Sequence, residues 1–135
     1  MKLADTSAWH RARHPQVAAA WRRAANREEL ATTEMIRLEV LYSARSGTEY
    51  DSITASLDGL PRLPCDRLAM RRALEVQRLL AHQGGLHHRV PTPDLVIAAV
   101  AELHDATVWH YDADYDRIAE VTGQPMEWVA PRGSL

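Results

Sequence analysis

Acidic side chains stand at four places where the chain is apolar or changes from one type of segment to another. They are Asp5, Glu39, Asp94 and the alternating run Asp112, Asp114 and Asp116. Carboxylates brought close together repel one another and take up protons unless a cation lies among them. Oxygen ligands, with no cysteine and no suitably spaced histidine beside them, favour Mg²⁺ or Mn²⁺ over zinc. The residue types therefore indicate a divalent-metal centre, provided that the fold gathers them.

Each of these acids also has a purely structural explanation. Asp5 precedes Thr6-Ser7 and can cap a helix. Glu39 can form an ion pair with an arginine, and Asp94 can complement the dipole at the start of a helix. The Asp run can be a polar turn. Which explanation applies depends on the elements that position these side chains.

The Asp run also resembles the beginning of an EF-hand calcium loop. Such a loop requires Gly at its sixth position and Glu at its twelfth. Those positions hold Arg117 and Gly123. An EF-hand is therefore excluded.

Short apolar segments alternate with longer amphipathic ones along the chain. The predicted strands are 3–4, 30–32, 60–63, 107–111 and 126–129, and the predicted helices are 16–27, 33–45, 49–57, 66–83, 93–101 and 117–121. This alternation predicts an α/β fold with a mainly parallel sheet and helices on both of its faces. In such a sheet the ends of the strands and the starts of the following helices lie at one edge. We therefore expect Asp5, Asp94 and the Asp run on the same side of the molecule.

Two of the predicted helices carry an acid in an apolar setting. In helix 33–45, Glu39 falls on the apolar face beside Met35 and Ile36. A buried, unpaired carboxylate is costly, so Glu39 must reach a partner or line a polar cavity. Helix 93–101 is apolar nearly all round, which predicts a buried helix with Thr92 as its cap and Asp94 at its mouth.

A length of 135 residues and an apolar share of 46% suit one domain with one core, so we predict a single domain over residues 1–135. No apolar run approaches the roughly 18 residues of a membrane span. The only cysteine, Cys65, has no internal partner, and the N-terminus does not resemble a signal peptide, so a reducing, cytoplasmic setting is expected. A net charge of −2 does not exclude a nucleic-acid substrate, because a local acidic site can offset basic patches.

Four segments together resemble the PIN-domain proteins, and among these the VapC toxins of bacterial type II toxin–antitoxin systems. The segments are 3–9, 36–45, 93–100 and 110–119. Their order and spacing extend over nearly the whole chain. The resemblance implies an α/β/α sandwich with a mainly parallel five-stranded sheet. It also implies a metal-dependent endoribonuclease, which hydrolyses phosphodiester bonds.

The resemblance further implies roles for individual residues. The acidic quartet of the family corresponds to Asp5, Glu39, Asp94 and Asp112. The first, third and fourth of these are expected to hold Mg²⁺, with Mn²⁺ as the alternative, while Glu39 completes the site or acts as general base. The auxiliary residues are Thr6 and Ser7 beside the first acid, and either Asp114 or Asp116. Tyr115 stands where the family often has Phe.

The implied substrate is RNA, either tRNA or rRNA, whose cleavage inhibits translation and growth. The implied partners are a VapB-type antitoxin and a second copy of the chain in a homodimer. Because the acids alone would repel RNA, arginines must bind its backbone. The candidates are Arg11, Arg13, Arg67, Arg71 and Arg78. Two other functions remain open: a PIN-like module that binds a partner without cutting RNA, and a metal-dependent phosphoesterase that acts on small nucleotides.

Overall fold

Four parallel strands form the sheet at the centre of the computed structural model, which describes all 135 residues. The strands are β1 (Lys2–Ala4), β2 (Leu30–Ala31), β3 (Thr107–His110) and β4 (Met126–Trp128). They lie in the order β2-β1-β3-β4, so the strand order reverses between β1 and β3. Open α/β sheets bind their ligands outside the carboxyl ends of the strands at such a point. The predicted parallel α/β fold is confirmed.

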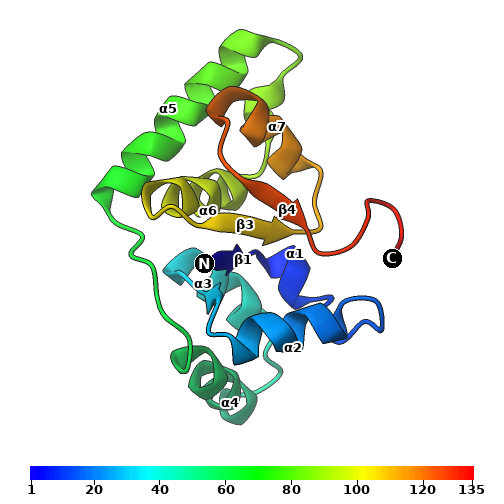
Figure 1. The fold of residues 1–135 in the computed structure, drawn as a ribbon. Coiled ribbons are helices and arrows are strands. Elements are labelled where there is room, and N and C mark those ends of the chain that lie inside the picture. The colour runs from blue at the N-terminus through cyan, green and yellow to red at the C-terminus, as the bar shows by residue number, and fades with distance from the viewer.

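Helices connect the strands and cover the sheet (Figure 1). They are α1 (Thr6–Trp9), α2 (Ala18–Asn26), α3 (Glu34–Tyr42), α4 (Gly47–Asp58), α5 (Arg67–Gln83), α6 (Thr92–Leu103) and α7 (Asp114–Thr122), with a 3-10 helix, η1, at His87–Arg89. Figure 1 shows α5, α6 and α7 above the sheet and α2 and α4 below it. No helix combines the length and the apolar character needed to cross a membrane.

Successive residues of a strand point to opposite faces of the sheet, and both faces are covered. Leu3 and Val108 face a core that includes residues of α3, α5, α6 and α7. Ala4 and Trp109 face a second core formed with α1 and α2. Because both faces are covered here, the two residues Leu3-Ala4 of β1 and the two residues Val108-Trp109 of β3 are all apolar, instead of alternating with polar residues.

The strand expected at 60–63 is reduced to a single bridge between Thr32 and Arg62. Thr32 donates its N–H to the carbonyl of Pro61 at 2.9 Å and accepts from the N–H of Leu63 at 2.8 Å. Pro61 and Pro64 have no N–H to donate, so the ladder cannot extend. The sheet therefore has four strands instead of the five expected, with this bridge at the fifth position.

Three further predictions are corrected at the boundaries of elements. Thr92 is the first residue of α6, and Pro91 takes the cap position before it, so Thr92 is not the cap. Helix α7 begins at Asp114 instead of residue 117, because Asp112 Oδ1 accepts a hydrogen bond from Asp114 N at 2.9 Å and satisfies an N–H at the helix start. Residues 86–90, which lie in none of the predicted helices or strands, contain the 3-10 helix His87–Arg89.

Helices α5 and α6 pack together on one face of the sheet. Residues 94–101 of α6 are all buried, as its apolar sequence predicted. The buried side of α5 consists of Ala69, Ala73, Val76 and Leu80. Leu68 is also apolar but is 60% exposed, because it lies about 100° around the helix from Ala69.

Candidate metal centre

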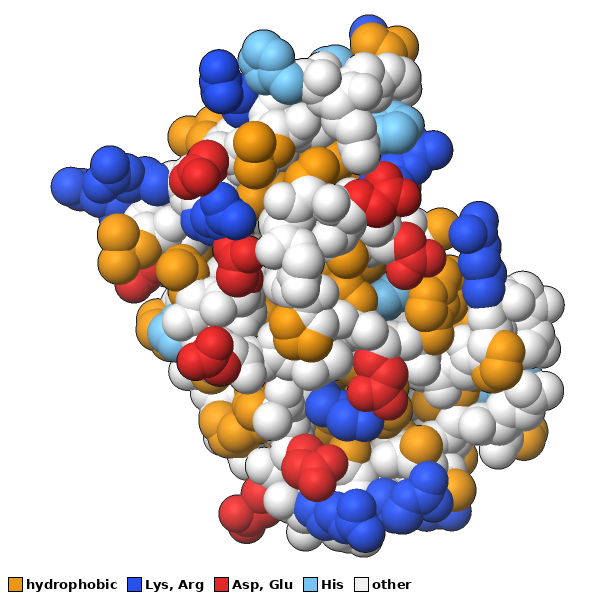
Figure 2. Space-filling model, turned by 45° about the horizontal axis from the view of Figure 1, so that its top comes forward, with side chains coloured by type: hydrophobic (Ala, Val, Ile, Leu, Met, Phe, Trp, Pro, Cys, Tyr) orange, Lys and Arg blue, Asp and Glu red, His pale blue; other side chains and the backbone are white.

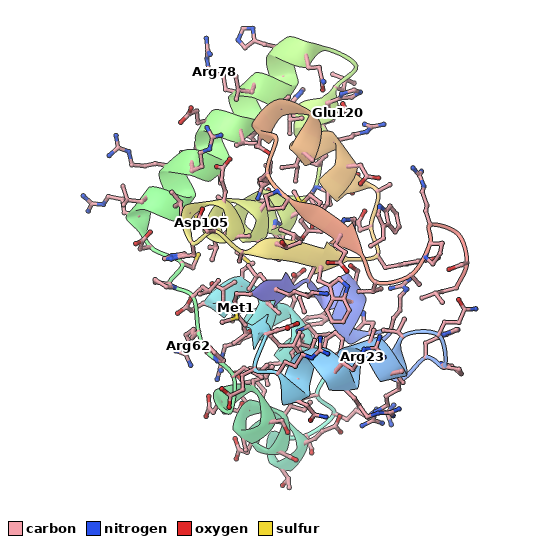
Figure 3. All side chains as sticks on the ribbon, viewed as in Figure 1. Met1, Arg23, Arg62, Arg78, Asp105 and Glu120 are labelled. Carbon is pink, nitrogen blue, oxygen red and sulfur yellow. The ribbon has the colours of Figure 1, made fainter.

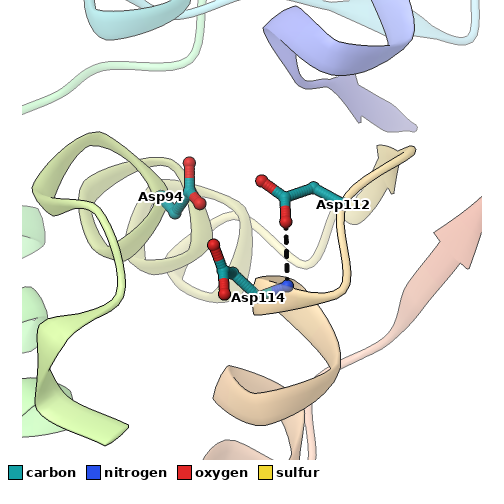
Figure 4. Close-up of side chains that lie close together, drawn as sticks. All are labelled: Asp94, Asp112 and Asp114. Atoms are coloured by element: carbon teal, nitrogen blue, oxygen red, sulfur yellow. Dashed lines mark hydrogen bonds between the residues drawn. The ribbon is translucent and has the colours of Figure 1, made fainter.

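Three carboxylates converge at the carboxyl edge of the sheet. Asp94 lies in the first turn of α6, Asp112 follows β3, and Asp114 begins α7. Figure 4 shows the three side chains pointing toward one another from these three segments. One oxygen of each carboxylate lies within 4.8 Å of the corresponding oxygens of the other two. The fold thus brings together acids that are distant in the sequence.

Asp5 follows β1 and caps α1, as its structural explanation predicts, and it lies outside the group of three carboxylates. Its side chain is buried. Oδ2 accepts hydrogen bonds from Ser7 N at 2.9 Å and from Ser7 Oγ at 2.6 Å, while Oδ1 accepts from the hydroxyl of Tyr115 at 2.7 Å. Ser7 Oγ in turn accepts from Tyr111 N at 2.9 Å, which links α1 to the end of β3. Three donors therefore hold the Asp5 carboxylate in one orientation.

Asp94 is the acid with the most unfavourable surroundings. It is only 7% exposed, and its Oδ2 has no hydrogen-bond partner. Burial, followed by the negative charges of Asp5 and Asp112, raises the pKa of Asp94 to about 8. Without a cation, Asp94 therefore holds a proton at neutral pH. A divalent ion that took the place of this proton would satisfy the orphaned oxygen.

Glu39 of α3 turns toward α1. Thr6 Oγ1 donates to Glu39 Oε1 at 2.9 Å, so the partner of Glu39 is a hydroxyl instead of an arginine. Partial burial raises the pKa of Glu39, the hydrogen bond from Thr6 opposes this, and the charge of Asp5 adds to it. Glu39 stands outside the three-carboxylate group, but its charge also contributes to the raised pKa of Asp94.

The structure distinguishes Asp114 from Asp116. Asp114 belongs to the carboxylate group, and its pKa is raised by burial and then by the charge of Asp112. Asp116 Oδ1 instead accepts a hydrogen bond from Trp128 Nε1 at 3.2 Å. Two residues along a helix differ by about 200° in direction, so only one of the pair can face Asp94.

Two aromatic residues of the site were not among the predicted site residues. Tyr115 is completely buried, and burial raises its pKa well above 10, so its hydroxyl remains a donor. His110 is also completely buried, and its Nδ1 accepts from Asp112 N at 3.2 Å. Burial lowers the pKa of His110, which keeps its ring neutral. The available signal was that each polar ring stands within two residues of an acid of the Asp run.

Arg11 and Arg13 lie on the side of the molecule that carries α1. Arg11 Nη1 donates to the carbonyl of Ser7 at 2.9 Å, and its guanidinium lies 4.3 Å from the centre of the Tyr111 ring. Because Ser7 also binds Asp5, Arg11 stands close to the acidic site. Arg13 lines a groove of about 680 Å³ beside α1.

The other candidate arginines lie on α5, away from the acids. Arg72 of α5 forms a salt bridge with Glu102 of α6 at 2.5 Å, so Arg67 and Arg71 lie beside the end of α6 opposite to the acids. Arg78 projects from the outer side of α5 (Figure 3). The structure therefore does not bring these three arginines to the carboxylates.

Comparison with known proteins agrees with this arrangement. Residues 2–121 match the PIN domain family. The chain is 54% identical over 132 residues to Ribonuclease VapC18 of Mycobacterium tuberculosis (strain ATCC 25618 / H37Rv). The aligned residues cover 97% of this chain and 96% of that relative. The chain is 41% identical over 133 residues to Ribonuclease VapC51 of the same strain, which covers 98% and 96%.

A solved structure supports the fold. A chain in the crystal structure of DNA-bound VapBC from Salmonella typhimurium superimposes with a TM-score of 0.76, covering 96% of this chain and 98% of that chain. At 17% identity this likeness shows the fold alone. The match over residues 2–121 and the identity to the M. tuberculosis ribonucleases also show the family. The chain belongs to the PIN-domain family and, within it, to the VapC ribonucleases.

Proposed function

We propose that this chain is a Mg²⁺-dependent endoribonuclease and the toxin of a type II toxin–antitoxin system. The observation that carries the proposal is the convergence of Asp94, Asp112 and Asp114, from three separate segments, within 4.8 Å of one another. The names of the M. tuberculosis relatives add the substrate class, because both relatives are called ribonucleases.

The residues at this edge fit a hard divalent cation. All the donors are carboxylate oxygens, as Mg²⁺ and Mn²⁺ prefer. Asp94 Oδ2 is buried without a partner, a costly state that an ion would relieve. Asp94, Asp112 and Asp114 would hold the ion directly, and Asp5 would hold it through a water. This set differs from the sequence-based one in including Asp114 and in assigning Asp5 a less direct part.

The bound ion would supply charge stabilisation to the phosphate and a more acidic water as nucleophile. Glu39 acts as the general base of the reaction. Its Oε1 is engaged by Thr6, which leaves Oε2 free to accept a proton. Its raised pKa brings it closer to the working pH than an ordinary glutamate, which favours proton transfer.

RNA binding requires positive charge beside the acids. Arg11 supplies it, held over the Tyr111 ring and by Ser7, so that its remaining N–H groups can meet a phosphate. On the face shown in Figure 2, acidic side chains lie among basic ones over much of the surface, and basic side chains gather along its lower edge. We expect contacts near Arg11 and Arg13 to bind the RNA backbone. Structured tRNA or rRNA is the proposed target.

A VapB-type antitoxin and a second copy of the chain are the proposed protein partners. The similar chain from S. typhimurium was solved as part of a VapBC assembly. A groove of about 680 Å³ between α1, α2, α3 and α4 offers an apolar floor for a helix of the antitoxin. Its apolar lining includes Trp9, Trp21, Val40, Ile53 and Leu57.

The test is cleavage of purified tRNA and rRNA by the purified chain, with Mg²⁺ and with excess EDTA. Wild type should cut one of these RNAs only with Mg²⁺. Asp112→Asn should remove the activity and remain folded by circular dichroism. The matched control is Asp51→Asn, because Asp51 is an exposed acid on α4. Equal cleavage by wild type and Asp112→Asn would contradict the proposal.

The same samples separate the two alternatives. Hydrolysis of small nucleotides or phosphate diesters, with all RNA left intact, would favour a phosphoesterase. Absence of both activities from a folded, metal-binding protein would favour a binding module without catalysis.

A further inference from the structure

Tyr115 is the one side chain whose hydroxyl lies within hydrogen-bonding distance of two of the site's carboxylates. Its hydroxyl donates to Asp5 Oδ1 at 2.7 Å and lies 3.4 Å from Asp94 Oδ1. A hydroxyl carries one proton, and the shorter contact has the usual length of an O–H···O bond. The proton therefore belongs to the bond with Asp5, and the hydroxyl oxygen stands between the two acids.

This bond limits what Asp5 can still bind. A carboxylate offers about four lone-pair sites. On Asp5, Ser7 occupies two of them through Oδ2, and Tyr115 occupies one on Oδ1. One site remains, also on Oδ1. Asp5 can therefore offer one oxygen lone pair to a water or an ion, and it cannot turn to offer two.

The buried ring of Tyr115 holds its hydroxyl in a fixed position. Tyr115 is 0% exposed and packs in the core with Ile118, one turn further along α7. Its ring also lies 4.9 Å from the ring of His110, at the end of β3. The hydroxyl cannot move away without disturbing the core.

The start of α7 thereby sets the position of three carboxylates. Asp114 is itself one of them, and its backbone N–H binds Asp112 Oδ1 at 2.9 Å. The next residue, Tyr115, holds Asp5. The start of α7 thus connects the residues that follow β1 and β3. The two carboxylates nearest the Tyr115 hydroxyl, Asp5 and Asp94, keep their spacing through this contact.

We infer that Tyr115 is a positioning residue of the metal centre, which acts by holding Asp5 in a single orientation at a set distance from Asp94. The inference rests on the proposed function, since it assigns Tyr115 a part in the same metal site. Groups that orient metal-site carboxylates from outside typically contribute about 10–100-fold to metal affinity. Tyr115 should do so without touching the ion.

The test is the affinity of Tyr115→Phe for Mn²⁺, measured by calorimetry and by electron paramagnetic resonance of free Mn²⁺. Phe keeps the buried ring and removes only the hydroxyl. The Mn²⁺ Kd should rise about 10–100-fold relative to wild type. The matched control is Tyr50→Phe, because Tyr50 is 44% exposed on α4, and its Kd should equal that of wild type.

Two further measurements separate positioning from a general loss of structure. The melting temperature in EDTA reports folding without metal. RNA cleavage by Tyr115→Phe should require a higher Mg²⁺ concentration for its half-maximal rate and approach the wild-type rate at saturating Mg²⁺. If Tyr115→Phe does not fold, Ser7→Ala removes another donor to Asp5 and should also weaken Mn²⁺ binding.

An unchanged Mn²⁺ Kd in folded Tyr115→Phe would overturn the inference, as would an unchanged Kd in Ser7→Ala if the first variant is unfolded. A different result would contradict the proposed function. A wild-type protein that binds Mn²⁺ but cuts no RNA would contradict the ribonuclease proposal, and it would leave the role of Tyr115 in metal binding intact.

Discussion

Replacing Asp94 by Asn should stabilise the metal-free protein increasingly as the pH rises, while it abolishes cleavage. In the folded protein, burial and the charges of Asp5 and Asp112 raise the pKa of Asp94 from 3.8 to about 8. The unfolded chain releases this proton near pH 4, whereas the folded chain keeps it until about pH 8. Between these values the folded state binds more protons, so the stability of the wild type falls as the pH rises. Asn resembles the protonated acid and has no such dependence.

The size of the effect follows from the raised pKa. Each pH unit within this window costs the wild type about 1.4 kcal/mol of unfolding free energy. The advantage of Asp94→Asn should therefore grow by about 4 kcal/mol from pH 5 to pH 8. Above about pH 8 it should level off, because both states have then lost the proton.

The assay is urea unfolding followed by circular dichroism in EDTA, at several pH values between 5 and 8, for wild type, Asp94→Asn and the exposed control Asp51→Asn. The series is then repeated with saturating Mg²⁺. An ion that binds only the folded state should stabilise the wild type at pH 8 and have little effect on Asp94→Asn. A stability difference that stays constant with pH, or equal stabilisation of both proteins by Mg²⁺, would refute the reasoning.

Three further changes test other parts of the molecule. Asp114→Asn should weaken Mn²⁺ binding by at least about tenfold. Asp116→Asn should have a much smaller effect, because Asp116 accepts a hydrogen bond from Trp128 instead. Calorimetry with Mn²⁺ compares the two variants. Arg11→Gln should weaken RNA binding, and the salt dependence of binding should fall by about one phosphate contact. Arg78→Gln, on the outer side of α5, should leave the affinity and its salt dependence unchanged. Filter binding at several salt concentrations measures both quantities. Leu80 of α5 is completely buried, so Leu80→Ala should lower the unfolding free energy by about 2–5 kcal/mol in urea titrations.

Much of the fold could be predicted because its local signals agree with its tertiary environment. The strands read as apolar pairs such as Leu3-Ala4, since a parallel sheet buries both faces. The apolar sequence of α6 led to a correctly predicted buried helix. The segment at 60–63 was apolar enough for a strand, but two prolines restrict its pairing to one bridge.

The arginines show where local signals end. Arg67, Arg71 and Arg78 share one side of a helix, which says nothing of where that helix packs. The antiparallel packing of α5 on α6 carries Arg67 and Arg71 to the end remote from the acids. Arg11 follows a four-residue helix with no periodic pattern, yet the link from Ser7 to Tyr111 places it beside the site.

The sequence by itself determined that acids follow strands and open helices, and hence that they share one edge of a parallel sheet. Only the tertiary structure decided which of them meet. Asp114 and Asp116 differ by about 200° around α7, and the rotation of that helix is set by the burial of Tyr115 and Ile118 in the core. The same burial brings the tyrosine hydroxyl to Asp5, which is 110 residues away in the chain. Spacing along a chain can place a residue at the end of an element, but the direction of its side chain depends on packing against residues that are remote in sequence.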